Sequence, residues 1–322
     1  ITFSRDTCFI VNRPLAAKHA LAIQGLTRDP DAVLSRGSRH LFIVPWHNHT
    51  LIGVWHVVHK GAPEMFTVTS KELQGFLDEI NAVYPAFALT LNDISMWNAG
   101  LVLFGDNKPG ATDLSYAKRS IIVDHTKDHH IEGLITVIGV RFTTARGVAV
   151  KAVDLVFKKL GKQIPRSRTD ETPIYGGRIE QLDKFLSQAI DDRPPAMSIE
   201  AIQALIYNHG SEYREVIKYI DKDPMWGEMV GTSQVIKAEV LHAVREEMAQ
   251  KLGDLVFRRT DLGTGSYPGE TALMESAELM ASELGWDKDR MEKELEEVKK
   301  VFPSHVLSEE GLGKLNEAHR TT

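Results

Sequence analysis

The 322-residue sequence contains a single cysteine, Cys8, and no run of 18 or more consecutive apolar residues. One cysteine excludes an internal disulfide and a cysteine-rich metal site, and it favours a reducing compartment. Without a long apolar run, no transmembrane helix is predicted, although attachment to a membrane surface stays open. The net charge of −6 gives no electrostatic reason to expect nucleic-acid binding. We therefore expect a cytoplasmic protein without a nucleic-acid partner, with peripheral contact at the inner face of a membrane left open.

What is present is typical of a globular protein. Hydrophobic residues make up 43% of the chain and charged residues 25%, both ordinary values. A chain of this length can bury a sizeable core and usually divides into two domains.

Residues 133–161 carry the most informative pattern. Leu134–Ile138 is a short β-branched run that predicts a buried strand. Gly139 ends this run, and helical spacing of apolar residues starts at Val148 and stops before Gly161. Backbone N–H groups at such a helix start can hold an anion or an electron-rich ring edge. Any unit of an α/β protein could show this pattern, so the pattern alone does not identify a function.

The same stretch resembles the closing signature of FAD-dependent glycerol-3-phosphate dehydrogenases and oxidases, G-L-[IV]-[ST]-V-x-G-G-K-x-T-T-[YW]-R. In that family the turn lies against the flavin ring and the substrate. The resemblance therefore implies cofactor contact for six residues: Gly139, Val140, Arg141, Phe142, Thr143 and Thr144. Arg141 stands where the family has lysine, and its positive charge could stabilise a reduced flavin or a substrate oxyanion.

Further matches lie in the first half of the chain. Residues 40–59 read as a β-hairpin and resemble the family pattern F-x-[IVL]-P-W-x-x-x-T-[LI]-[IA]-G. By alignment with the family, Arg119 is implied to face the substrate, and Cys8, His40 and His56 are implied to line its pocket. Val102 departs from the family, because it stands where an arginine is thought to hold the substrate phosphate. Arg141 and Arg119 are the residues expected to act on the substrate's charge.

Five histidines fall within the expected hairpin: 40, 47, 49, 56 and 59. His47 and His49 would project to the same side of an extended strand, which could pair them as metal ligands. No carboxylate lies close to them in sequence, so surface or hydrogen-bonding roles are favoured. An acid–base role for one of the five stays open, and no metal site is predicted.

The second half of the chain reads as helical. An apolar stripe over residues 235–252 predicts a long helix that continues into 255–260. It resembles the family's A-E-[VI]-x-[YW]-A-V-R-x-E-M-A segment. Glu239 and His242 have the spacing of a di-metal helix bundle, but a second Glu-x-x-His is absent. We therefore interpret this helix as scaffold or subunit contact, with a homodimer left open.

The expected fold class combines α+β and α/β elements. Residues 1–162 form an antiparallel substrate-domain sheet, closed by the last strand-turn-helix of an FAD-binding domain at 133–160. Residues 163–177 form a polar linker, and residues 178–322 an all-helical domain. The chain starts at Ile1 and lacks a G-x-G-x-x-G motif, the usual grip on a dinucleotide pyrophosphate. The resemblance thus implies the C-terminal part of a longer protein, and weak FAD binding by this part alone.

Three functions follow from this interpretation. The first is an FAD-dependent oxidoreductase that passes a hydride from C2 of glycerol-3-phosphate to the flavin, yields dihydroxyacetone phosphate, and delivers electrons to quinone or oxygen. The second keeps the flavin but acts on a non-phosphorylated hydroxy acid or polyol, as Val102 suggests. The third is a non-catalytic interaction module, motivated by the missing dinucleotide motif.

Overall fold

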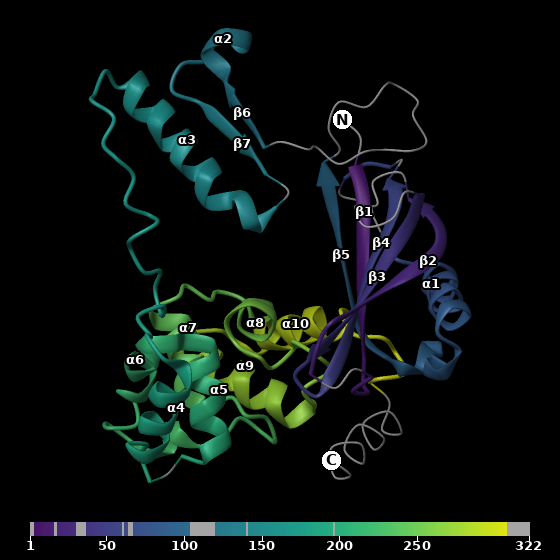
Figure 1. Cartoon of the computed structure of the whole chain (residues 1–322). Coiled ribbons are helices and arrows are strands. Elements are labelled where there is room, and N and C mark those ends of the chain that lie inside the picture. Colours follow the sequence, from purple (N-terminus) through teal and green to yellow (C-terminus); the bar gives the residue numbers. More distant parts are fainter. Residues whose placement is uncertain are drawn as a thin grey trace.

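A computed structural model describes residues 3–15, 18–29, 37–59, 61–63, 67–103, 120–139, 141–195 and 197–307. Three parts can be distinguished in Figure 1: a twisted sheet with one covering helix, a strand pair with a long helix beside it, and a group of helices that ends the described chain. Across these residues, no helix is both long and apolar enough to cross a lipid bilayer.

The sheet has five antiparallel strands in the order β2-β3-β4-β1-β5. The strands are β1 (Phe3–Val11), β2 (Leu21–Asp29), β3 (Gly37–Trp46), β4 (His49–His59) and β5 (Ile94–Leu103). The predicted hairpin is confirmed as β3 and β4, whereas β2 was not predicted. His47 lies in the turn in a left-handed conformation, and His49 already belongs to β4. The two histidines therefore do not share one face of an extended strand.

Helix α1 (Ser70–Val83) covers one face of the sheet. It begins with a capping box, in which the Thr69 side chain accepts a hydrogen bond from the Glu72 amide and the Glu72 carboxylate accepts one from the Thr69 amide. Phe76 on its inner side meets Phe9 of β1 edge to face, with ring centroids 4.9 Å apart. Phe9 and Val11 of β1 thus belong to this core, and Ser4, Asp6 and Cys8 point away from α1 by alternation.

The strand pair consists of β6 (Ile121–Asp124) and β7 (Ile135–Ile138), joined by α2 (His125–His129). Helix α3 (Ala145–Lys159) follows β7, as the sequence predicts. The expectation that this strand is buried is wrong: Leu134 is 45% and Val137 47% exposed. The reason is that β7 pairs only with β6 among the described residues, and that no residue of α3 is fully buried.

A segment without helix or strand joins α3 to the last group of helices. Its far end is fixed to the C-terminus of α5 (Ile199–His209), because Ser211 N donates to the Gly176 carbonyl at 2.9 Å. A Cβ at Gly210 would lie 2.0 Å from that carbonyl oxygen. Only glycine permits this close approach, and the positive φ of Gly210 has the same requirement.

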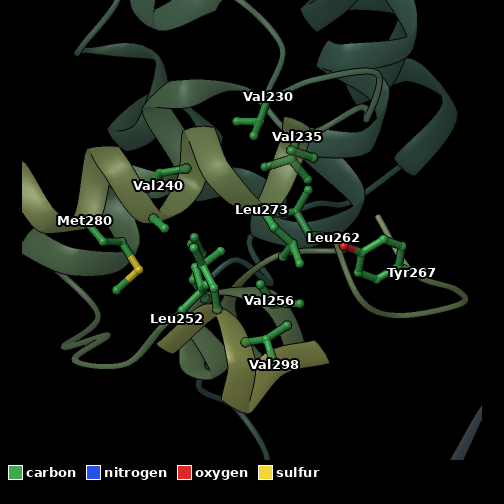
Figure 2. Close-up of a cluster of buried hydrophobic side chains, with 14 of the residues drawn as sticks. Val230, Val235, Val240, Leu252, Val256, Leu262, Tyr267, Leu273, Met280 and Val298 are labelled. Carbon is green, nitrogen blue, oxygen red and sulfur yellow. The ribbon is translucent and has the colours of Figure 1, made fainter. Parts of the chain in front are cut away.

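The helical part packs around two hydrophobic cores, and the larger one is drawn in Figure 2. The remaining helices of this part are α4 (Leu182–Asp191), α6 (Tyr213–Ile217), α7 (Lys237–Arg245), α8 (Leu252–Asp254), α9 (Glu270–Leu284) and α10 (Lys288–Lys299). Ile10 of β1 and Met96 of β5 belong to the larger core. Trp46 also donates its indole N–H to the Thr264 carbonyl at 2.9 Å. The sheet and the helical part are therefore packed against each other.

The single long helix expected over residues 235–252 is wrong in length. Helix α7 ends at Arg245, and the chain turns at Met248, which has a φ of 60°. A new turn starts at Lys251, where the Asp254 carboxylate accepts a hydrogen bond from the Lys251 amide, and it continues as a π-helical turn over Leu255–Arg259. The apolar spacing predicted the burial of Ile236, Val240, Leu241 and Leu252, but not this interruption, which leaves Met248 81% exposed.

Helices α7 and α9 are joined by an ion pair whose contribution depends on pH. Arg245 donates through Nε and Nη2 to the two oxygens of Glu283, both at 2.6 Å, and this pair lowers the pKa of Glu283. Glu283→Gln should lower the free energy of unfolding by about 1 kcal/mol at pH 7. Because the folded pKa is the lower one, this contribution is complete above the unfolded value of about 4.3 and is lost as the pH falls through the folded value.

Urea denaturation of both proteins at pH 7 and at pH 3 measures this difference. Glu292→Gln is the matched control, because its carboxylate pairs with Lys288 at 3.6 Å while both side chains are more than half exposed. We expect almost no change from the control. A Glu283→Gln effect that stays constant down to pH 3 would contradict the ion-pair explanation.

Candidate functional site

The sheet face that points away from α1 carries a polar network. Asp6 of β1 lies opposite His56 of β4, and residues opposite each other project to the same face. Asp6 Oδ1 lies 2.9 Å from His56 Nδ1 and accepts a hydrogen bond from Ser4 Oγ at 2.6 Å. The side chains of Asp6 and His56 are 20% and 27% exposed, so the pair is only partly covered. A carboxylate that holds an imidazole in this way orients it for proton transfer.

Strand β5 leaves space beside this network. Gly100 lies opposite Asp6, and a Cβ at Gly100 would meet no atom of the described residues within 4 Å. Two residues further along, Val102 lies opposite Ser4 and thus projects to the same face. The Asp6–His56 pair is therefore bordered by open space on the β5 side.

Cys8 and His40 lie on this face as well. Cys8 is two residues from Asp6 and opposite Asn98, and its Cβ would contact any Cβ placed at Gly53. Burial raises the pKa of the Cys8 thiol, and the negative charge of Asp6 adds to this increase. The thiol is therefore protonated at neutral pH and is a poor nucleophile. His40 is placed on the same face by alternation with Leu41, whose side chain is buried under α1.

The strand-to-helix turn after β7 forms one wall of a cavity of about 740 Å³. The opposite wall comes from the ends of β1 and β5, with Phe3, Leu101 and Val102. The walls are mostly apolar, and Arg141 is the one cationic residue among the described residues that line them. An apolar cavity of this size with a single charge matches sites that hold a flat organic ligand and fix its orientation.

The structure thus brings some of the residues predicted from sequence together and leaves others apart. Gly139, Arg141 and Phe142 line the cavity together with Val102, and the Phe142 side chain is fully exposed at its edge. Thr143 and Thr144 are exposed in the same turn, where Thr144 Oγ1 donates to the Arg141 carbonyl at 3.2 Å. Cys8, His40 and His56 lie on the sheet face but not in the cavity wall. Arg119 and Val140 lie outside the described residues.

Asp6 is a residue of this site that the sequence analysis missed. The available signal was a carboxylate two residues before Cys8, just ahead of the apolar run Phe9–Val11. Its partner His56 is 50 residues away, and only the pairing of β1 with β4 brings the two together.

Comparisons with known proteins agree with this architecture. Residues 167–291 match the family model for the C-terminal domain of alpha-glycerophosphate oxidase. The glycerol-3-phosphate dehydrogenase of Synechocystis sp. is 29% identical over 274 residues, which are 84% of this chain and 48% of that protein. The mitochondrial glycerol-3-phosphate dehydrogenase of Bos taurus is 27% identical over 276 residues, which are 82% of this chain and 36% of that protein.

A solved structure extends the comparison to the fold. The glycerol-3-phosphate dehydrogenase from Bacillus halodurans, complexed with FAD, matches with a TM-score of 0.70 at 20% identity, over 93% of this chain and 56% of that one. The chain therefore has the fold of the corresponding part of that protein, and it spans about half the length or less of the relatives it matches. These findings agree with the resemblance read from the motifs: the chain is similar to glycerol-3-phosphate dehydrogenases over more than 80% of its length, and residues 167–291 match the C-terminal domain of alpha-glycerophosphate oxidase.

Proposed function

We propose that this chain is the substrate-side and C-terminal part of an FAD-dependent oxidoreductase that oxidises glycerol-3-phosphate at C2 to dihydroxyacetone phosphate. The observation that carries the proposal is the cavity between the ends of β1 and β5 and the turn after β7, with Arg141 in its wall. The similarity to glycerol-3-phosphate dehydrogenases over more than 80% of the chain supports the same assignment.

The residues present fit the ring system of a flavin. The cavity offers apolar surface on both sides, from Val102 and Phe3 on the sheet and from Val137 and Ile138 on β7. Residues 139–144, in the turn between β7 and α3, would hold the cofactor in this cavity. When bound, FAD supplies the hydride acceptor, and the protein supplies orientation and electrostatics.

A second observation supports a larger FAD-binding domain around β6, β7 and α3. Apolar side chains are exposed along these elements: Ile121, Leu134, Val137, Phe142, Val153, Val156 and Leu160 are between 42% and 101% exposed. Several large apolar side chains exposed along two strands and one helix are typical of a surface that another part of the protein covers. The remainder of the FAD-binding domain, with the G-x-G-x-x-G motif that this sequence lacks, is the partner we propose for it.

Two groups of this chain act on the substrate in this proposal. The Arg141 guanidinium stabilises negative charge that develops in the cavity. His56, whose Nδ1 lies 2.9 Å from Asp6 Oδ1, would accept the proton of the C2 hydroxyl, and the cofactor would supply the acceptor for the C2 hydride. The balance is a two-electron oxidation of a secondary alcohol to a ketone. Arg119 remains a further candidate for contact with the substrate's charge.

Val102 favours a second candidate, a flavin oxidoreductase for a non-phosphorylated hydroxy acid or polyol. Its side chain lines the cavity at the position where the family pattern has an arginine. An isopropyl group offers no hydrogen bond to a phosphate, whereas a guanidinium offers two. The phosphate of glycerol-3-phosphate would then need Arg141 or Arg119 as its cation.

The remaining assignments follow from the same proposal. Quinone or oxygen receives the electrons from the reduced cofactor. The protein works in the cytoplasm, with peripheral contact to the inner face of the membrane when the acceptor is a quinone, and a homodimer is compatible with the exposed helical faces.

Anaerobic addition of glycerol-3-phosphate to the flavin-loaded full-length protein should bleach the flavin absorbance. Arg141→Gln should slow this bleaching by about 10²- to 10³-fold, the usual effect of removing one group that stabilises transition-state charge. Stopped-flow absorbance measures both rates. Arg166→Gln is the matched control, because Arg166 is exposed in the linker and pairs with Glu171 at 2.9 Å. Absence of bleaching while flavin is bound, or equal rates in both variants, would refute the assignment.

Val102→Arg distinguishes the two substrates. For glycerol-3-phosphate we expect KM to fall about tenfold, equivalent to about 1.4 kcal/mol, because the new guanidinium can bind the phosphate. KM for glycerol should not change, and Val102→Leu, which keeps the wall apolar, should leave both values as they are. Steady-state turnover with the two substrates measures this. A wild-type protein that turns over glycerol or a 2-hydroxy acid far better than the phosphate ester would establish the second candidate instead.

A further inference from the structure

The helical part contains a cluster of metal-ligating side chains far from the proposed flavin site in the sequence. His209 at the end of α5, His242 on α7 and Glu247 just after α7 each offer a ligand atom, and these atoms all lie within 4.8 Å of one another. The imidazole rings of His209 and His242 meet edge to face, with centroids 5.5 Å apart. No other group of three such residues occurs within the described ranges.

Both histidines are buried, and one has an unsatisfied nitrogen. His209 and His242 are 8% and 3% exposed. His242 Nδ1 is buried and has no hydrogen-bond partner among the described protein atoms, while its Nε2 lies 4.0 Å from Glu247 Oε1. A buried polar atom without a partner is rare in a folded protein. An ordinary hydrogen-bonded core histidine therefore does not account for His242.

A fourth residue, Glu239, contacts His209 and fixes the orientation of its ring. Glu239, 2% exposed, lies with its Oε1 3.3 Å from His209 Nε2, and its Oε2 accepts a hydrogen bond from the Ile236 amide at 3.0 Å. A carboxylate that engages one nitrogen of an imidazole leaves the other nitrogen for a metal ion and fixes the ring's orientation, which is the usual surrounding of a histidine ligand.

The cluster also has access to solvent. His242 and Glu247 line a second cavity, of about 370 Å³, together with Tyr175, Glu215, Lys218 and Glu246. An ion held by His209, His242 and Glu247 would therefore lie at the cavity wall, with one coordination position left for water. This cavity also gives the ion a path of entry.

We propose that His209, His242 and Glu247 bind one divalent transition-metal ion of the zinc type, with Glu239 as the positioning residue behind His209. Two imidazoles, one carboxylate and one open position are a ligand set that Zn²⁺ commonly takes. Tetrahedral ligands of zinc lie about 3.3 Å apart, so side-chain shifts of roughly 1 Å close the site. The ion links α5, α7 and the segment after α7. This inference is independent of the flavin and of the substrate.

Single positions in the sequence could not show this site. Glu239 and His242 have a metal-like spacing, but the second histidine comes from another helix and the ligating carboxylate from the turn after Arg245. That turn exists because α7 is shorter than its apolar stripe.

Zinc titration of the metal-stripped chain, in competition with a chromophoric chelator, tests the proposal. We expect one Zn²⁺ per chain, a zinc-dependent rise in melting temperature, and visible absorption of four-coordinate cobalt when CoCl₂ is used instead. His242→Phe, which keeps the ring volume, and Glu247→Gln should each weaken zinc binding at least 100-fold. Glu239→Gln should weaken it about 10- to 100-fold, as expected for a residue that acts through a ligand.

The control comes from an exposed histidine pair in the same chain. His125 Nδ1 and His129 Nδ1 lie 3.2 Å apart on α2, so they could collect zinc unspecifically. His129→Asn should leave the tight site unchanged. The proposal is overturned if the His129→Asn variant loses zinc binding while the His242→Phe variant keeps it. A zinc dissociation constant of the wild-type protein above about 100 µM also overturns it. If His242→Phe fails to fold in the metal-free form, Glu247→Gln, whose side chain is 27% exposed, decides the question by the same titration.

Discussion

The two faces of β1 are the constraint on which the rest of this structure depends. The strand lies between β4 and β5, so both of its edges are paired. Phe9 and Val11 belong to the core under α1, while Ser4, Asp6 and Cys8 point to the opposite face. A register slip of one residue would exchange the two sets. The apolar core on one side therefore holds the polar network of the other side in place.

The elements with a strong local signal were predictable from the sequence. The hairpin of β3 and β4 and the helix after Gly147 depend on strand alternation and helical spacing, which neighbouring residues determine. The family motifs added the turn at Gly139–Thr144 and the helical character of the second half. These signals do not depend on which residues pack against the sheet in the folded protein.

What the sequence did not reveal depends on distant contacts. β2 was missed, and the burial of the strand at 135–138 was overestimated, because burial depends on what covers a strand and not on its own composition. The Asp6–His56 pair and the grouping of His209 with His242 both need tertiary packing. The end of α7 at Arg245 was not predicted, because the apolar stripe continues past it. The left-handed conformation that follows is adopted by Met248 and not by a glycine, so the sequence carries no signal for it.

The shared core of sheet and helices has a consequence for how the chain unfolds. Ile10 and Met96 come from the sheet but are buried among side chains of the helical part, and Ser95 Oγ donates to the Gly265 carbonyl at 2.6 Å. Loss of either part would expose apolar surface of the other. The linker near residue 178 separates the two parts along the chain, but the two parts unfold together. Heat should therefore melt the sheet and the helices in one calorimetric transition. A fragment cut at that linker would not keep its native core.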